Sequence, residues 1–522
     1  MSEGDGHPDH EHHAFLGSAT LIAGCTMLSR VLGMVRDVLM ANYFGAARAS
    51  DAFLTAWRVP NLFRRLFGEG AASSAMVPTF TASLATRPAE ETQRLFSVTA
   101  TVLFLFLSAI TLLIEGVVAG LLWWGDFLPR TTLLLQYLAV LMPYMVLICM
   151  SAFLMAVLNA HKRFFAPAMM PVVLNVVWIA AIYLLTLLVD DRGVGGRWLT
   201  LAILLGGGLQ LMFQVPFVMR SGVRLRPSLD VSHPGFRQIL GLMGPVIVGS
   251  AVVQINALID AALAWFLVDT GAPSHLYYGN RLMHLPIALI GVAISTAVLP
   301  TLSEHAVSGE VQRFKRSLMS ALRTALFWSI PASFGLVALS SPTIEVMFRH
   351  GKFTGVAADR TAFVLVCYGL GVWAQTGVFV LLRAFYARGD TRTPLFVAWV
   401  AVLLNVVLNL TLIWSMKEAG LALATSISGV AQFVMLFVLL RRRLGPLGGR
   451  DAAVASMKTL SVSVVMGTLA ALAWFFLWPE GAHHVVRIAV LAGIILGAIG
   501  VFLAGTAALG MEEPRQMLRF RR

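Results

Sequence analysis

Fourteen apolar runs, each long enough to cross a membrane as a helix, follow one another along the 522 residues of the chain. About twenty apolar residues span ~30 Å of hydrocarbon as a helix, which satisfies its own backbone hydrogen bonds where water is absent. The chain is 58% hydrophobic and 12% charged, so its apolar surface exceeds what a soluble core could bury. We therefore predict an all-α integral membrane protein with about fourteen transmembrane helices. The predicted spans are 15–44, 49–86, 96–124, 131–159, 165–189, 197–219, 238–268, 275–302, 318–341, 361–387, 393–415, 419–440, 453–478 and 485–510.

The charges of the loops predict the orientation of the chain. With a cytoplasmic N-terminus, the inner loops and the C-terminal tail carry 21 Lys and Arg residues and the outer loops carry 9. Cytoplasmic loops are enriched in these residues, so we expect both termini on the cytoplasmic side. The same rule accounts for the net charge of +13 without a nucleic-acid partner. The polar N-terminus lacks a basic n-region, which predicts an uncleaved first span and not a signal peptide.

Two parts of the chain resemble each other. Residues 57–80 match 283–302, residues 158–179 match 386–410, and residues 207–220 match 429–442. The corresponding prolines and glutamines keep a separation of 222 to 227 residues. Six spans separate the matching elements, and because six is even the two copies share one orientation. Parallel repeats of this kind are typical of transporters, with the binding site expected between the halves.

The repeat predicts the organisation of the chain as two six-helix lobes followed by two further helices. The predicted parts are a polar cytoplasmic tail (1–14), an N-lobe of spans one to six (15–220), a cytoplasmic linker (221–237), a C-lobe of spans seven to twelve (238–443), two extra spans (444–510) and a basic cytoplasmic tail (511–522).

Charged residues lie inside several of the apolar runs. An ionisable group at the bilayer centre costs ~2.5 to 3.5 kcal/mol on insertion scales, and such groups usually face a protein interior or a wet cavity. Span two also contains Pro60, Gly68 and Gly70, which predict a bend or an interruption of its helix. The charged residues are Arg30, Arg36 and Asp37 in span one, Asp51, Arg58, Arg64, Arg65 and Glu69 in span two, and Arg281 in span eight.

Part of this charge is expected to pair internally. We expect Arg36 or Arg30 to pair with Asp37 or Asp51, and Arg64 or Arg65 to pair with Glu69. A network of such pairs that only fixes helix packing is the alternative for any single residue. It leaves an excess, because six arginines face three acids. Surplus guanidinium groups favour an anionic ligand, and their planar fork suits phosphate.

Other residue patterns narrow the class of protein. The chain has no G-x-x-x-x-G-K-[ST] phosphate loop, so ATP is not expected to drive it directly. Cys25, Cys149 and Cys367 fall inside predicted spans and offer neither a disulfide framework nor a zinc-ligand spacing. Asp260 is a lone acid in span seven, where a cation site or proton carrier and a simple helix contact both stay open. Secondary transport is the function class that these patterns favour.

Residues 29–80, SRVLGMVRDVLMANYFGAARASDAFLTAWRVPNLFRRLFGEGAASSAMVPTF, closely resemble the signature region of the MurJ (MviN) family of bacterial lipid II flippases. YYGNRLMHLP (277–286), GKFT (351–354) and ARGDTRTP (387–394) agree with it. The family belongs to the multidrug/oligosaccharidyl-lipid/polysaccharide exporter superfamily. The resemblance implies two six-helix lobes in a V, with two C-terminal helices forming a groove for the lipid tail.

The resemblance also implies the substrate and its site. Lipid II, an undecaprenyl diphosphate carrying a disaccharide-pentapeptide, would move from the cytoplasmic to the periplasmic leaflet by alternating access, with the diphosphate held by arginines. Relatives often have an acid where this chain has His284, which leaves charge pairing there open. Some relatives have a sodium site on spans seven and eleven, for which Asp260 is the candidate here. The implied substrate-binding residues are Ser29, Arg30, Arg36, Asp37, Asp51, Arg58, Arg64, Arg65, Glu69 and Arg281.

The expected protein is therefore a transporter of the bacterial inner membrane and not an enzyme. No metal or organic cofactor is expected, and transport would be coupled to the membrane potential, Na⁺ or H⁺. Lipid II and membrane lipid are the expected partners, cell-wall synthesis enzymes are further candidates, and a monomer is favoured. The alternatives are a flippase for another polyprenyl-diphosphate saccharide, a cation-coupled exporter, a non-transporting scaffold for cell-wall enzymes and, third, a polytopic enzyme.

Overall fold

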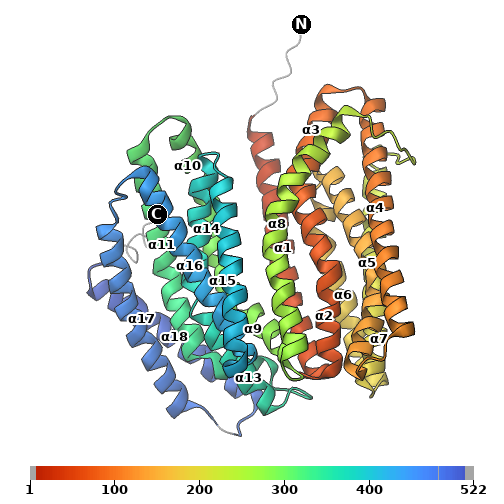
Figure 1. Ribbon diagram of the computed structural model, residues 1–522. Coiled ribbons are helices and arrows are strands. Elements are labelled where there is room, and N and C mark those ends of the chain that lie inside the picture. Colours follow the sequence, from red (N-terminus) through yellow and green to blue (C-terminus); the bar gives the residue numbers. More distant parts are fainter. Residues whose placement is uncertain (1–7, 480, 512–522) are drawn as a thin grey trace. The chain divides into compact units, whose positions relative to one another are not determined.

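The computed structural model describes residues 8–479 and 481–511, without the side chains of residues 8–19, 69, 71–73, 245, 248 and 449–451. Within these residues the chain folds into helices joined by short loops, with no strand (Figure 1). The α-helices are α1 Pro8–Phe44, α2 Arg48–Phe63, α3 Val77–Thr86, α4 Ala89–Trp124, α5 Pro129–Ala160, α6 Phe165–Leu188, α7 Arg192–Met219, α8 Pro234–Leu267, α9 Ala272–Pro286, α10 Ala293–Val307, α11 Val311–Ala338, α12 Ser340–Phe348, α13 Gly355–Gly369, α14 Val372–Ala387, α15 Arg392–Met416, α16 Glu418–Leu444, α17 Gly449–Leu477 and α18 His484–Ala508. Two π-helical segments, η1 Arg64–Met76 and η2 Ile287–Val292, complete the list.

The all-helical membrane fold predicted from the sequence is confirmed, but the count of fourteen spans is not. Among the described residues, 11 helices are long and apolar enough to cross a membrane, or 12 if the pair α13 and α14, bent by 42°, is one span. The two predicted spans that fail this test are 15–44 and 49–86. The physical reason is their charge, because they contain the acids and arginines of the signature region.

The second predicted span is interrupted as expected. It forms α2, η1 and α3 in succession, and η1 begins four residues after Pro60. The matching span of the second repeat forms α9, η2 and α10, and η2 begins directly after Pro286. Proline lacks the backbone N–H that an α-helix needs, and π-helical turns are rare segments that often lie at functional sites. The two repeats therefore share an irregular helix at the same position.

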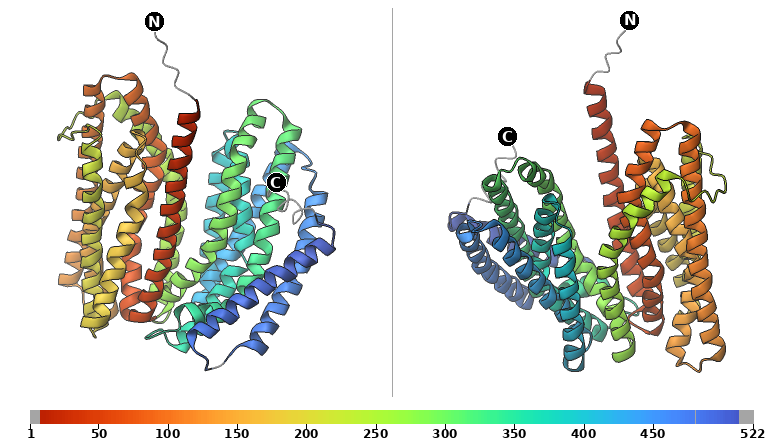
Figure 2. Two further views of the ribbon diagram at one scale, coloured as in Figure 1. Left: turned by 180° about the vertical axis from the view of Figure 1, so that it is seen from behind. Right: turned by 45° about the horizontal axis from the view of Figure 1, so that its top comes forward.

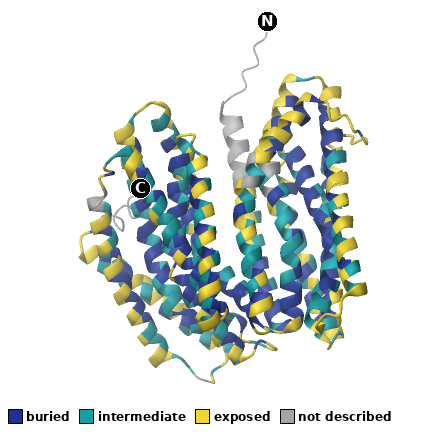
Figure 3. Ribbon diagram, viewed as in Figure 1, coloured by how far each residue is buried: buried dark blue, intermediate teal, exposed yellow. Residues whose placement is uncertain are grey.

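The chain divides into two compact units, residues 1–254 and 255–522, so the division falls inside α8. In the first unit α5 packs against α2, α4, α7 and η1. Fully buried aromatic side chains fill this core, among them Phe53, Phe80, Phe153 and Tyr144. Figure 3 shows buried residues on the helix faces that turn toward neighbours within the unit. The exposed faces are also apolar, as Leu112 and Leu113 on α4 show with 68% exposure each, which suits contact with lipid.

Residues 224–228, which precede α8, form an extended segment, here called the strap, that runs along α4. Every second backbone N–H of the strap donates to a side chain one helical turn further along α4. Two extended residues advance ~6.6 Å and four helical residues advance ~6.0 Å. The backbone donors of the strap therefore stay aligned with the side-chain acceptors of α4. The pairs are Arg224 N to Gln93 Oε1 (3.0 Å), Arg226 N to Ser97 Oγ (3.1 Å) and Ser228 N to Thr101 Oγ1 (3.0 Å).

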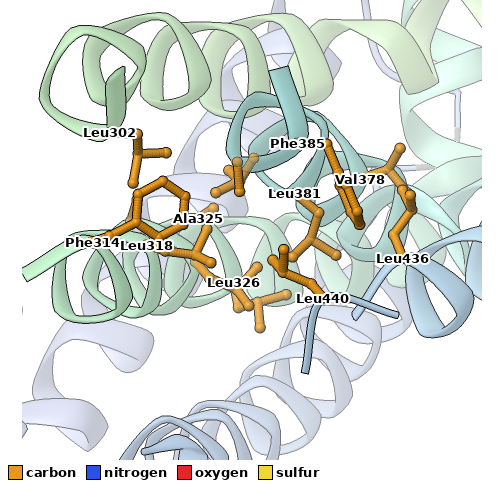
Figure 4. Packing of buried hydrophobic residues seen from close by; sticks show 14 of the residues in the cluster. Leu302, Phe314, Leu318, Ala325, Leu326, Val378, Leu381, Phe385, Leu436 and Leu440 are labelled. Atoms are coloured by element: carbon orange, nitrogen blue, oxygen red, sulfur yellow. The ribbon is translucent and has the colours of Figure 1, made fainter. Parts of the chain in front are cut away.

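The second unit has its own apolar core, built by α10, α11, α14 and α16 (Figure 4). Leu318, Leu381 and Leu436 are completely buried there, and Phe314 and Phe385 are buried to within 2%. Burial of one such side chain contributes ~1.5 to 3 kcal/mol relative to exposure to water, although inside a membrane packing supplies more of the stability than the hydrophobic effect.

The two helices outside the repeat, α17 and α18, pack on α11 and α12 of the second unit (Figures 1 and 2). Met466 and Phe502 form an apolar cluster with Phe327 of α11. Glu345 of α12 accepts hydrogen bonds from Arg349 Nη1 (2.9 Å) and from Arg487 Nη1 of α18 (2.8 Å). This appended pair is thus joined to the second unit by both apolar packing and an ion pair.

Candidate functional site

The best-defined polar cluster inside the first unit centres on Arg36 and Asp37 of α1. The Arg36 Nε and Nη2 atoms donate to Asp37 Oδ1 at 3.0 and 2.8 Å. The Asp37 side chain is 1% exposed and the Arg36 side chain 13%. This confirms the predicted pairing of Arg36 with Asp37. Because the pair is largely removed from water, each charge contributes to the neutralisation of the other.

Helix α6 completes this cluster with two residues that the sequence reasoning did not select. Asn175 accepts a hydrogen bond from Arg36 Nη1 (3.1 Å) and donates to the backbone oxygen (3.1 Å) and the hydroxyl (3.4 Å) of Ser29. The guanidinium carbon of Arg36 lies 4.4 Å from the ring centre of Trp178, within range of a cation–π contact. Ser29, Arg36 and Asp37 are therefore brought together by α1 and α6.

Arg30 behaves differently from Arg36. Its side chain is exposed, although Met27 (61% exposed) and Val31 (55%) beside it are apolar. Within the described residues Arg30 has no hydrogen-bond or ion-pair partner. An arginine inside an apolar helix costs ~2.5 to 3.5 kcal/mol on insertion scales. A group kept at such a cost, with no partner in the described part of the chain, is suited to an external anion.

Asp51 lies in the first turn of α2 and is completely buried. Its Oδ2 lies 3.8 Å from Nη2 of Arg130, the second residue of α5. Arg130 precedes the predicted span 131–159, so the sequence did not predict it as a partner of Asp51. The first turn of a helix also favours an acid, because the helix dipole is positive there.

The remaining basic residues of span two lie near the transition from α2 to η1. Arg58 and Arg64 are half-buried, and Arg65 is exposed. Arg64 Nε donates to Asn61 Oδ1 (2.8 Å), and Arg65 Nη1 donates to Gln254 Oε1 of α8 (3.5 Å). The side chain of Glu69 lies outside the described residues, so its predicted pairing with Arg64 or Arg65 stays a prediction.

Arg281 belongs to the second unit. It is half-buried on α9, five residues before Pro286, and His284 on the next turn is exposed. The predicted set thus comprises nine residues of the first unit and Arg281 of the second. Its role in substrate binding stays a prediction for all ten.

A second polar cluster surrounds Asp260 of α8. Asn409 Nδ2 donates to Asp260 Oδ1 (2.6 Å) and lies 2.9 Å from Asn405 Oδ1. With the Asn405 amide turned over, its nitrogen is 3.2 Å from Asp260 Oδ1 and 2.9 Å from Asn256 Oδ1. Asn405 and Asn409 are buried, and Asn409 Oδ1 has no hydrogen-bond partner among the described residues. Oxygen donors of this kind suit a hard cation.

The sequence contains a signal for Asn175 and Asn405, which were not among the predicted site residues. The tetrapeptide Leu-Asn-Val-Val occurs at 174–177 and again at 404–407, in matching spans of the repeat. An amide repeated in two apolar helices predicts an internal polar contact, because an unpaired amide in hydrocarbon is costly. In both units the repeated asparagine lies on the helix that contacts the first long helix of that repeat, α1 or α8.

Comparison with known proteins agrees with this architecture. Residues 40–502 match the family model of the lipid II flippase MurJ. A probable lipid II flippase MurJ of Vibrio cholerae is 36% identical over 434 residues, which cover 81% of this chain and 82% of the relative.

Solved structures show the same relationship. The structure of lipid II flippase MurJ in an inward closed conformation matches 94% of this chain and 98% of its own length, with a TM-score of 0.77 and 27% identity. An inward-facing multidrug resistance MATE family transporter of the MOP superfamily shares the fold, with a TM-score of 0.66 at 12% identity over 83% of this chain and 99% of its own. The chain belongs to the lipid II flippase MurJ family of membrane transporters.

Proposed function

We propose that this chain moves lipid II from the cytoplasmic to the periplasmic leaflet of the bacterial inner membrane. Its family and its apolar helices make it a multi-pass transporter and not an enzyme. The observation that carries the proposed substrate is the arginine-rich signature region, in which Arg30 is exposed and has no partner within the described residues. A diphosphate is the anion that such guanidinium groups fit best.

The proposed mechanism is alternating access. The arginines of the signature region and Arg281 bind the diphosphate of the lipid, and the two units rock to expose the headgroup on the other side. The polyprenyl tail stays in hydrocarbon along α17 and α18, so that only the polar headgroup needs a protein path. Two units with separate cores support such a rigid-body motion.

Translocation of a headgroup through this path requires no bond to be broken. It does require an energy source or a concentration difference between the leaflets. A membrane potential of 100 mV performs work of ~2.3 kcal/mol per elementary charge that crosses it. With the arginine-rich region inside the membrane field, the potential biases which side the site faces. Both termini lie in the cytoplasm in this arrangement.

Depletion and rescue test the proposed substrate. In a bacterium depleted of its own lipid II flippase, expression of this chain should restore growth and the appearance of lipid II in the periplasmic leaflet. An empty vector is the control and should give neither. Growth without periplasmic lipid II would instead indicate a scaffold for cell-wall enzymes. Accumulation of a different polyprenyl-diphosphate saccharide in cells that lack the chain would indicate another transported lipid. Either result contradicts the proposal.

We also propose that the cluster around Asp260 binds a monovalent cation that couples to transport. Four polar side chains lie close together there, those of Asp260, Asn256, Asn405 and Asn409. Asn409 Oδ1 is buried and has no hydrogen-bond partner among the side chains and backbone that the structure describes, which supports the proposal because an acceptor without a donor in such a place is costly. A bound Na⁺ would supply what this oxygen lacks and would neutralise the carboxylate. A proton on Asp260 is the competing possibility.

Sodium-dependent stability distinguishes these two. We expect Na⁺ to raise the thermal unfolding temperature of the purified chain above its value in choline chloride at equal ionic strength. Binding to the native state stabilises it by about 2.7 kcal/mol at a hundredfold excess over Kd. Asp260→Asn should remove this increase, whereas Asp269→Asn, at an exposed acid two residues after α8, should preserve it. The same Na⁺ effect in Asp260→Asn would contradict a sodium site at this cluster.

A further inference from the structure

We infer that Asn175 is a positioning residue for the diphosphate site, because its side-chain amide holds the Arg36 guanidinium and Ser29 in fixed relative places. The inference rests on the proposed function, since it presupposes that Arg36 binds the diphosphate. Asn175 is 5% exposed, so it acts through Arg36 and Ser29 and not by contact with the lipid headgroup.

The amide of Asn175 bridges two turns of α1. Its oxygen accepts from Arg36 Nη1 (3.1 Å), while its nitrogen donates to Ser29 through the backbone oxygen (3.1 Å) and the hydroxyl (3.4 Å). Residues 29 and 36 lie seven apart, so they share a face of the helix about 10.5 Å apart along its axis. Helical side chains lean toward the N-terminus, which lets the long arginine reach back toward Ser29. One amide from α6 can therefore contact both.

Three hydrogen bonds and one aromatic ring hold the orientation of the guanidinium. Asp37 Oδ1 accepts from the Nε and Nη2 edge, and Asn175 accepts from Nη1. These hydrogen bonds lie in the plane of the group and prevent its rotation within that plane. Trp178, one turn after Asn175 on α6, faces the guanidinium at 4.4 Å and limits its tilt. A group held in this way loses little freedom when it binds an anion.

Asp37 alone could not give this orientation. It holds one edge of the guanidinium with a single oxygen, and the long arginine side chain could still swing about that oxygen. The Asn175 contact adds a second fixed point on a different helix. It also joins α6 to α1 at this depth, so the position of the charge depends on the packing of both helices.

The second unit uses an asparagine at the equivalent place of the repeat. Asn405 occupies the matching position in the second Leu-Asn-Val-Val sequence. Its amide lies within hydrogen-bond distance of Asn409 and, with the amide turned over, of Asp260 on α8. In each unit an amide on the later helix thus lies within hydrogen-bond distance of a charged residue on the first long helix. The recurrence indicates that a contact from this asparagine to the first long helix is a shared feature of the two copies of the repeat.

Binding measurements on the full chain test the role of Asn175. The probes are undecaprenyl diphosphate and undecaprenyl monophosphate, titrated into the purified chain. Asn175→Leu keeps the branched shape of the side chain but removes both halves of the bridge. We expect its affinity for the diphosphate to fall about tenfold, as for loss of a hydrogen bond to a charged group. The preference for diphosphate over monophosphate should shrink, because the orientation of the guanidinium fork matters more for the larger anion. Val176→Ala, at an exposed neighbour, should bind both probes like the parent.

A double-mutant cycle separates positioning from stability. In an Arg36→Lys background there is no planar fork to orient, so Asn175→Leu should have little further effect on the ratio of the two affinities. Asn175→Ser serves as a second variant if the leucine variant does not fold. An unchanged ratio in the folded variants, or an equal loss with and without Arg36→Lys, would overturn the inference. Normal diphosphate binding by Arg36→Ala would refute the site assignment itself, whereas a defective Arg36→Ala with a normal Asn175→Leu would refute the positioning role alone.

Discussion

Replacement of Arg30 by alanine should abolish rescue of a strain depleted of its own lipid II flippase. Arg30 is an exposed charge within an apolar helix and has no partner within the described residues. Its removal should therefore favour insertion of α1 into the membrane but lower the affinity for the anion. A charge-assisted hydrogen bond contributes about 1.5 to 3 kcal/mol, which corresponds to roughly a tenfold to hundredfold loss of affinity. The measurements are growth after depletion and lipid II in the periplasmic leaflet.

Two further variants sharpen this test. Arg30→Lys keeps the charge but loses the planar fork, so we expect partial rescue. Arg94→Ala removes an exposed arginine from the first turns of α4, outside the predicted site, and should rescue fully. Equal expression of the three variants in the membrane is the necessary control. Full rescue by Arg30→Ala would contradict the assignment of Arg30 to the diphosphate and would favour a role in helix packing or topology.

Replacement of Asp37 by asparagine should destabilise the first unit strongly. The change removes the negative charge of the Asp37 side chain, which is 1% exposed. The Arg36 side chain, which is 13% exposed, then lacks the carboxylate that pairs with it. Removal of one partner of a buried pair typically costs about 3 to 5 kcal/mol, because the other charge stays buried. Thermal unfolding of the purified chain in detergent should show a clear drop in the midpoint temperature.

Neutralisation of both partners gives the matched comparison for this prediction. The double variant Arg36→Gln, Asp37→Asn carries neither charge of the pair and should recover much of the lost stability, although the proposed function predicts that it does not flip lipid II. Asp126→Asn, at an exposed acid between α4 and α5, should unfold like the parent. A midpoint for Asp37→Asn equal to that of Asp126→Asn would show that the pair contributes nothing to stability.

The stability and transport of the double variant together decide between two roles of the Arg36–Asp37 pair. If the pair only fixes the packing of α1 on α6, neutralisation of both residues should preserve flipping as well as folding. If Arg36 also binds the diphosphate, folding recovers and flipping does not. The alternative of a packing network and the proposed site therefore give opposite results for one variant.

Much of the helical framework follows from the sequence alone. The predicted spans 131–159 and 165–189 correspond to α5 (Pro129–Ala160) and α6 (Phe165–Leu188). Hydropathy predicts them because a long apolar segment is stable in hydrocarbon as a helix, which satisfies its own backbone hydrogen bonds. The interruption of the second span shortly after Pro60 was likewise predictable, since proline removes a hydrogen-bond donor. The short helix α12 (Ser340–Phe348) was missed because nine residues are too few to give a span signal.

The candidate site was predictable only in part. The acid and base at positions 36 and 37 are neighbours in the chain, and their pairing was expected from the sequence and is observed. The partners on other helices were not expected. Arg130 lies near Asp51, Asn175 bridges Ser29 and Arg36, and Asn409 contacts Asp260. Each of these contacts joins residues more than seventy positions apart.

By itself, the sequence determined that this is a helical membrane protein with an internal repeat and with charges concentrated in its first two apolar runs. Only the tertiary structure decided which of those charges are neutralised within the protein and by which helix. The physical reason is that a membrane helix can be apolar on every side, as α6 and α15 nearly are, so hydropathy reports its length but not the face that it turns to its neighbours. Contacts across helices depend on that rotation, and it is fixed by packing.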